Sequence, residues 1–344
     1  MTTPIEDRTP RGDGLSMPAE WEPHQACLIA WPTSEDLWLS FMDQAKDEYA
    51  ELARAIAAFE PVIMICNPGD AGEVRDRCGA GVDPLEIPID DSWIRDNGPA
   101  FVTDGSGRLA AVHFGFNGWG ERYSPYDKDA RAPEAIAAHL GVPRYVAPLV
   151  LEGGSFSVDG EGTLLTTEQC LLNPNRNPEL SREDIEAALR AYLGVETVVW
   201  LPHGMAKTST DGHVDGIAQF VRPGVVALLR PSDEGDPNRP LADENLAALT
   251  RARDARGRSF EVLEMTEIAY PPPAGEEHGI AYLNTYLANG AVIAPLAGVA
   301  GPDANALELL RGCFPDREVV GVNARVLSYG GGGPHCVTQQ VPAT

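Results

Sequence analysis

The segment CLIAWPTSEDLWLSFMDQAKDEYAELARAIAAFEPVIMIC, residues 27–66, contains one strand–helix–strand unit. Its two apolar runs, CLIAW (27–31) and PVIMIC (61–66), have the length and composition of strands. Between them, residues 35–59 are typical of a helix. Strands that alternate with helices predict an α/β class of fold.

The same alternation continues along the chain. Further strand-like runs lie at 144–148, 197–202, 225–230 and 291–295, and further helix-like segments lie at 131–140, 181–193 and 303–313. Ser181 followed by Asp184 is typical of a helix start, and Gly194 is typical of a helix end. The 29 prolines and 35 glycines are spread throughout, so no break demands two domains. We expect a flexible, polar lead-in over residues 1–14 and a single catalytic domain over residues 15–344.

The charge of the chain restricts its partners. There are 26 Lys and Arg residues against 51 Asp and Glu residues, a formal charge of −25. Nucleic acids and anionic membranes require a basic surface, so neither is expected as a partner. An acidic surface fits a small cationic substrate, although most of these carboxylates simply solvate the surface. No run approaches the roughly 20 apolar residues of a membrane-spanning helix, and the polar start is not a signal peptide, so we expect a cytoplasmic protein.

Cysteine and histidine spacing gives no sign of a metal or a cofactor. The six cysteines form no CxxC pair, which favours a reducing compartment, and the histidines show no metal-ligand spacing. There is no phosphate-binding loop, and the YGGGG run at 329–333 does not lead into a helix. We therefore predict neither a metal nor an organic cofactor. Cys27 and Cys66 lie inside apolar runs and are expected in the core.

Reactive side chains gather in turn-rich segments. In TDGHVDG (210–216), His213 and Asp215 share a face if the segment is an extended strand, and Asp211 points the same way. A histidine beside carboxylates is suited to acid–base catalysis, but a hydrogen-bonded surface turn explains the pattern as well. In GGGGPHC (330–336), glycines leave Cys336 little covered, so this residue is either a nucleophile or an inert thiol.

Two other segments carry carboxylates beside turns. DDSWIRDNGP (90–99) combines Trp93, Arg95 and Asp96, and Glu152 precedes two glycines after an apolar run. Asp96, Glu152 and His213 follow one another at 56 and 61 residues, and Cys336 comes 123 residues later, about twice 61. One reactive residue per structural unit, each at an equivalent strand end, would converge on a central axis.

Together these segments resemble the agmatine deiminase family, a branch of the guanidino-group-modifying superfamily that includes bacterial peptidylarginine deiminases. The resemblance covers nearly the whole chain. Its blocks are MPAEWEPHQACLIAWP (17–32), DSWIRDNGP (91–99), GFNGWG (115–120), LEGGSFSVDGEGT (151–163), CLLNPNRNP (170–178), TDGHVDGIA (210–218), YLNTYLANGAVIAP (282–295) and GGGGPHCVTQQ (330–340). It implies a five-bladed ββαβ propeller of the pentein type, with the site on its axis.

The resemblance also implies a role for each matched residue. Cys336 would attack the guanidinium carbon, and His213 would protonate the departing ammonia and then activate water. Glu152 would contact the guanidinium and orient His213, and Asp96 and Asp215 would hold the guanidinium through paired hydrogen bonds. Trp93 would line the substrate channel, and His335 would be structural. The implied reaction converts agmatine and water to N-carbamoylputrescine and ammonia, in the synthesis of putrescine, and family members often form homo-oligomers.

Three departures from the family pattern leave the substrate open. Where the family usually reads DETDGHVDN and GGGNIHC, this chain reads TSTDGHVDG (208–216) and GGGGPHC. Ser209 replaces an acid, Gly216 replaces asparagine, and Gly333-Pro334 replaces Asn-Ile. A missing acid weakens selection for the amine at the far end of agmatine. The alternatives are therefore free arginine, a guanidino acid or peptidyl arginine as the substrate, an amidinotransferase, or a catalytically silent propeller-shaped binding protein.

Overall fold

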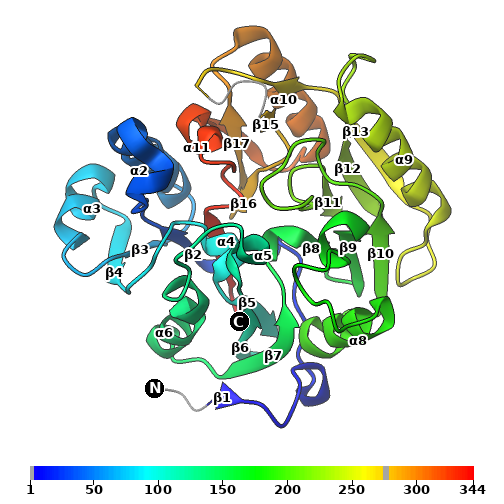
Figure 1. Ribbon diagram of the computed structural model, residues 1–344, viewed down its shortest axis with the longest axis horizontal. Coiled ribbons are helices and arrows are strands. Elements are labelled where there is room, and N and C mark those ends of the chain that lie inside the picture. Colours follow the sequence, from blue (N-terminus) through cyan, green and yellow to red (C-terminus); the bar gives the residue numbers. More distant parts are fainter. Residues whose placement is uncertain (1–3, 274–278) are drawn as a thin grey trace.

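The computed structural model describes residues 4–273 and 279–344, which form one α/β domain. Five sheets of three or four strands surround the middle of the molecule, and the longer helices lie on the outside (Figure 1). The α/β class and the single domain expected from the sequence describe this part of the chain.

The first sheet holds the segment that opened the sequence analysis. Its strands, in spatial order, are β19 (Thr338–Pro342), β2 (His24–Ala30), β3 (Val62–Cys66) and β4 (Val82–Glu86). Its helices are α1 (Glu35–Trp38), a 3₁₀ turn at Leu39–Phe41, α2 (Met42–Ala57) and α3 (Ala71–Cys78). The C-terminal strand β19 is antiparallel to β2, so the two ends of the chain build one sheet.

The single helix predicted over residues 35–59 is wrong at one point, because it breaks at Leu39. This residue has φ +47° and is largely exposed, and α2 starts afresh at Met42. Beyond the break, Tyr49, Leu52 and Ile56 repeat at helical spacing and are fully buried against the sheet.

Three further sheets follow in chain order. The second is β1 (Pro4–Ile5), β7 (Arg144–Val150), β6 (Leu109–Gly115) and β5 (Ala100–Thr103), with helices α4 (Ile94–Asn97), α5 (Gly118–Glu121) and α6 (Ala132–Leu140). The third is β10 (Thr197–Leu201), β9 (Thr163–Thr167) and β8 (Phe156–Val158), with α7 (Glu168–Leu171) and α8 (Arg182–Leu193). The fourth is β11 (Ala218–Arg222), β12 (Val225–Leu229) and β13 (Glu261–Met265), with α9 (Asn238–Arg251).

The fifth sheet closes the series. It consists of β16 (Tyr286–Ala288), β17 (Ala291–Leu296) and β18 (Glu318–Asn323), with α10 (Ala300–Cys313) and α11 (Arg325–Tyr329). A small pair, β14 (Ile268–Ala269) and β15 (Ile280–Ala281), stands beside it. Short 3₁₀ turns complete the described elements at Arg11–Asp13, Asp129–Arg131 and Gly153–Ser155.

The five larger sheets share one connection pattern. In each, an antiparallel strand pair is followed by a parallel strand that is reached through helical structure. The antiparallel pairs are β19–β2, β5–β6, β8–β9, β11–β12 and β16–β17. The chain therefore repeats a ββαβ unit five times, at the spacing of about 60 residues that the sequence suggested.

The expected flexible lead-in over residues 1–14 needs correction where the structure describes it. Strand β1 pairs in parallel with β7, with Pro4 opposite Arg144. The carboxylate of Asp13 accepts a hydrogen bond from the Tyr145 hydroxyl. Backbone pairing and this bond fix residues 4–14 on the second sheet, so the domain begins earlier than residue 15. Residues 1–3 lie outside the described part.

Candidate active site

The segments that carry the predicted site residues lie at equivalent places in the five units. Asp96 belongs to α4, just before β5, and Glu152 comes just before β8. His213 and Asp215 precede β11, and Cys336 precedes β19. Each residue thus stands a few positions ahead of the first strand of a unit, and the structure brings all five together in the middle of the molecule (Figure 1).

The unit between His213 and Cys336 supplies a residue that sequence reasoning missed. Asn284 stands just before β16, and its side-chain nitrogen lies 3.2 Å from Cys336 Sγ. The 123-residue interval was twice the spacing of the others, and this was the signal for an additional site residue midway.

The thiol of Cys336 lies between polar side chains. Its sulfur is 3.4 Å from Asp215 Oδ2 and 3.4 Å from Asn284 Oδ1. Burial, together with the carboxylates of Asp215 and Asp96, raises the pKa of this thiol well above its ordinary value. The free site therefore holds a protonated thiol, and a bound cation that neutralises the two carboxylates favours the thiolate.

His213 is placed between the other two carboxylates. Its Nδ1 lies 3.8 Å from Asp96 Oδ1, and its Nε2 lies 3.9 Å from Glu152 Oε2. Burial alone would lower the pKa of His213, but Asp96, Cys170 and Glu152 together raise it well above the ordinary histidine value. The imidazole is therefore protonated at neutral pH and available as an acid.

The segment 210–216 is a loop rather than the extended strand predicted from its spacing. Asp211 has φ +59°, and its carboxylate turns away from Asp215 to pair with Arg176 and Arg122. Asp211 consequently does not share a face with His213 and Asp215.

Asp215 and Asp96 are each held in place by hydrogen-bond donors. His335 Nδ1 lies 3.0 Å from Asp215 Oδ2, and His335 Nε2 lies 3.1 Å from Glu20 Oε1. Burial would raise the pKa of Asp215, but His335, His213 and the Cys336 thiol lower it, so this group is a carboxylate.

Asp96 receives hydrogen bonds from Trp119 Nε1 and from the backbone amide of Gly154, both at 2.9 Å. Burial raises the pKa of Asp96, and the nearby Asp215 and Glu152 add to this effect. Arg95 does not pair with its neighbour Asp96: its guanidinium donates to Gln340 at 2.9 Å and lies 3.6 Å from Glu20.

Gly154 lies at the centre of the charged groups. A Cβ atom here would come within 2.9 Å of His213 Nδ1, Asp96 Oδ1 and Asp215 Oδ2. The missing side chain keeps open the space that these three residues face. That space is suited to a planar cation whose N–H groups point toward carboxylates.

Two cavities open from Cys336. We call one the aromatic cavity; its wall includes Trp93, Phe116, Trp119 and Tyr123, with Asp91 and Asp96 among its acidic groups. The other is the glycine-loop cavity, lined by Lys207, Ser209, His213, Asp215 and Gly331–Gly333. Cys336, Ser209, Thr210 and Gly331 line both, so residue 209 stands beside the reactive thiol. Trp93 takes its place on the cavity wall and stacks on Trp38.

One group of potential metal ligands occurs within residues 4–273 and 279–344: the buried side chains of Glu152, Cys170 and His213. Glu152 Oε1 already lies 2.6 Å from Arg176 Nε, and its other oxygen faces His213. The acid–base arrangement described above accounts for the position of Glu152 and His213.

This fold and site define a deiminase. Residues 16–342 match the Porphyromonas-type peptidyl-arginine deiminase family, and the chain belongs to that family. Among its relatives, the agmatine deiminase of Pseudomonas aeruginosa is 41% identical, and the alignment covers 97% of each chain. The agmatine deiminase of Pseudomonas fluorescens is 43% identical with the same coverage.

Solved structures agree. The agmatine deiminase of Enterococcus faecalis superposes with a TM-score of 0.94 at 34% identity, covering 99% of both chains. The resemblance seen in the sequence blocks is thus confirmed over the full length. In residues 4–273 and 279–344, no helix has both the length and the apolar character needed to cross a membrane.

Proposed function

We propose that this chain hydrolyses the guanidinium group of a small cationic substrate, agmatine before others, through a covalent intermediate on Cys336. The observation that carries the proposal is the position of one thiol beside two carboxylates and a protonated histidine around the space left by Gly154. The 34–43% identity to agmatine deiminases supports agmatine as the substrate.

The first half-reaction follows from these positions. The guanidinium is held by Asp96 and Asp215, and its positive charge offsets the two carboxylates that keep the thiol protonated. The thiol proton leaves, Sγ forms a bond to the guanidinium carbon, and His213 gives its proton to the departing nitrogen. Ammonia is released, and an amidino-thioether remains on Cys336.

The second half-reaction returns the enzyme to its starting state. His213, now neutral, takes a proton from water, and the hydroxide oxygen bonds to the same carbon. The C–S bond then breaks, the ureido product leaves, and the sulfur recovers a proton. Glu152 supports both halves because it faces His213 Nε2 and stabilises its cationic form.

For the architecture, we propose the five-bladed, pseudo-symmetric pentein propeller. Two observations support it: the ββαβ unit occurs five times, and the site segments precede the first strand of each unit. We also retain as proposals a cytoplasmic location, a homo-oligomeric state, and the absence of nucleic-acid and membrane partners.

A second candidate is a deiminase for a guanidino acid. Two observations favour it: Ser209, which lines both cavities, has no charge, and Lys207 adds a positive charge to the glycine-loop cavity. A tail carboxylate would suit this surroundings better than an ammonium.

A panel of guanidino compounds tests both candidates. Ammonia release is measured for agmatine, arginine, guanidinobutyrate and a peptidyl arginine, with Cys336→Ala as the blank. Activity on agmatine far above the rest supports the first candidate, and preference for guanidinobutyrate supports the second. Silence of the wild-type chain on every compound contradicts both and favours a binding protein.

A further inference from the structure

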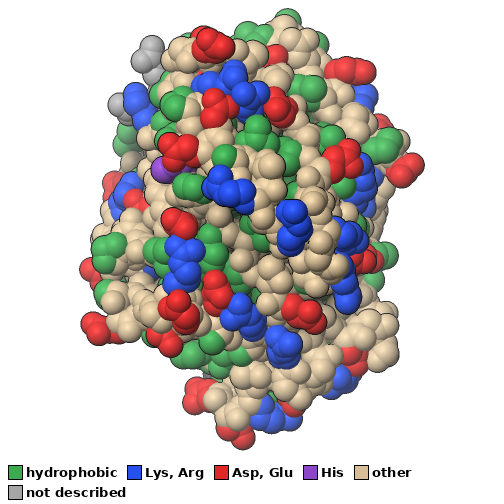
Figure 2. Space-filling model, turned by 90° about the vertical axis from the view of Figure 1, so that its right-hand side faces the viewer, with side chains coloured by type: hydrophobic (Ala, Val, Ile, Leu, Met, Phe, Trp, Pro, Cys, Tyr) green, Lys and Arg blue, Asp and Glu red, His purple; other side chains and the backbone are tan. Residues whose placement is uncertain are grey.

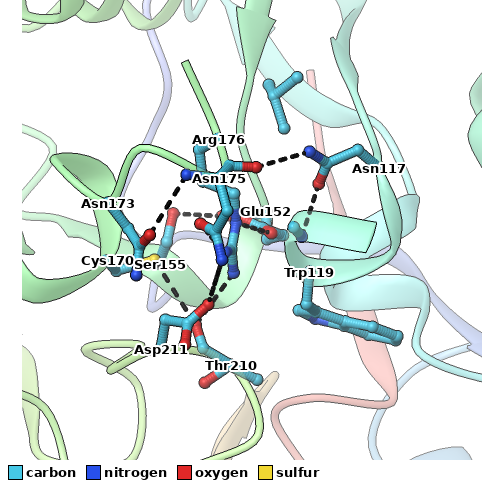
Figure 3. Close-up of polar contacts among 12 residues, drawn as sticks. Asn117, Trp119, Glu152, Ser155, Cys170, Asn173, Asn175, Arg176, Thr210 and Asp211 are labelled. Carbon is cyan, nitrogen blue, oxygen red and sulfur yellow. Dashed lines mark hydrogen bonds and ion pairs between the residues drawn. The ribbon is translucent and has the colours of Figure 1, made fainter. Parts of the chain in front are cut away.

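The catalytic carboxylate Glu152 rests on a buried arginine that the mechanism above does not use. Arg176 lies in the turn between α7 and α8, and it is 4% exposed, while Glu152 is 1% exposed. Arg176 Nε donates to Glu152 Oε1 at 2.6 Å, which leaves Oε2 facing His213. Figure 3 shows the Arg176 side chain running between Glu152 and Asp211.

The remaining donors of Arg176 grip the loop that carries His213. Nη1 donates to Asp211 Oδ2 at 2.8 Å, and Nη2 donates to the Thr210 carbonyl at 3.0 Å. One guanidinium therefore joins the segment of the carboxylate to the segment of the histidine, which are about 60 residues apart in the sequence.

Several neighbouring residues fix this arginine from the outside. Asp211 is held in its left-handed conformation while it accepts from Asn175 at 2.9 Å and from Arg122 at 2.6 Å. Gly120 closes the other side, because a Cβ there would lie 2.3 Å from Asn175 and 2.9 Å from Arg176. Strain and close approach in one place indicate that the arrangement is built rather than incidental.

We propose that Arg176 is a positioning residue, which keeps Glu152 ionised with one oxygen turned to His213 and ties the two catalytic segments together. Asp211 is its outer partner. The inference rests on the proposed function, because it concerns the acid–base pair of that reaction.

Charge determines how the variants differ. Arg176→Met removes a cation beside the Glu152–His213 pair, so both groups hold their protons more strongly. The acid limb of kcat/KM against pH then moves to higher pH, and kcat falls about 100-fold because the pair is no longer aligned. Arg176→Lys keeps the charge and restores the position of the limb, but only part of kcat. Asp211→Asn removes an anion and moves the limb the opposite way, to lower pH.

The experiment measures pH–rate profiles of the full chain on its best guanidino substrate. The matched control is Arg182→Met, whose guanidinium pairs with Glu168 and lies over Trp200, away from the site; it keeps the wild-type profile. Shifts of opposite sign for Arg176→Met and Asp211→Asn, with recovery in Arg176→Lys, support the proposal.

An unshifted limb in Arg176→Met overturns it, whatever happens to kcat. If Arg176→Met does not fold, Asp211→Asn decides: an unshifted or raised limb overturns the proposal. The wild type serves as the reference for the function itself, since an inactive wild type contradicts the proposed function and an active wild type with unshifted variants contradicts only this inference.

Discussion

Cys336 Sγ lies 3.4 Å from Asp215 Oδ2, so the proposed nucleophile faces a carboxylate that opposes its ionisation. The arrangement keeps the thiol protonated until a cation arrives. A site of this kind is quiet toward oxidants and alkylating agents and becomes reactive in the presence of its substrate.

This relationship predicts an inverse effect of Asp215→Asn on two rates. Removal of the negative charge lowers the pKa of Cys336, so alkylation by iodoacetamide at pH 8 accelerates about tenfold. Turnover is lost, because the guanidinium loses one of its carboxylates. Alkylation is followed by mass spectrometry, with Cys336→Ala as the control for the other thiols. Slower alkylation in the variant would show that Asp215 does not oppose ionisation.

Gly154→Ala tests the empty space at the centre of the site. The new methyl group would meet His213, Asp96 and Asp215 at under 3 Å, so we expect kcat to fall about 100-fold while the fold is retained. Gly312→Ala is the matched control, because it lies in α10 with no atom within 4 Å of its Cβ position. Its activity stays at the wild-type level, and its stability rises by about 0.5–1 kcal/mol. Full activity in Gly154→Ala would mean that the guanidinium binds elsewhere.

Ser209→Glu tests how the chain selects the tail of its substrate. A carboxylate beside both cavities attracts an ammonium and repels a carboxylate, so kcat/KM for agmatine rises roughly fivefold and that for guanidinobutyrate falls. The ratio of the two kcat/KM values is the measurement, and Ser232→Glu, in the turn after β12, is a control outside both cavities. An unchanged ratio would remove residue 209 from the specificity of the enzyme.

Glu20 links stability to pH through His335. Although burial opposes ionisation, His335 and Arg95 lower the pKa of Glu20 from 4.5 to about 2. This carboxylate therefore contributes about 3 kcal/mol to the free energy of unfolding above pH 4.5, a contribution that disappears as the pH falls toward 2. Denaturant unfolding of Glu20→Gln should show that difference from the wild type at pH 7 and about half of it or less at pH 3. A difference independent of pH would place the effect in packing instead.

Sequence patterns predicted the local elements well where the signal was local. The strand CLIAW and helix α8, with its Ser181–Asp184 capping box and Gly194 end, were found because neighbouring residues alone specify them. The break at Leu39 was not predicted, since nothing in the helical spacing of residues 35–59 marks a residue with positive φ.

The candidate site was partly predictable for a related reason. Motifs brought out Asp96, Glu152, His213, Asp215 and Cys336, because each sits in a turn-rich segment of its own. Arg176, Asn284 and Glu20 act through contacts between segments far apart in the sequence, and only the fold brings those contacts about. Asp211 was misplaced because the spacing of its segment suggested a strand where the structure has a loop.

Charge alone also says little about the site. Figure 2 shows acidic and basic side chains interspersed on one face of the molecule, as expected of carboxylates that mostly solvate the surface. Selection of a cation rests instead on the few buried carboxylates around Cys336.

The central claim is the covalent intermediate on Cys336, and mass spectrometry of acid-quenched enzyme tests it most directly. During turnover of agmatine, we expect the chain to gain the mass of agmatine less one ammonia, on the peptide that contains Cys336. Cys336→Ala should lose both the adduct and the turnover, whereas Cys66→Ala and Cys313→Ala should keep nearly all activity. Turnover that persists in Cys336→Ala, or an adduct on another cysteine, would contradict the account.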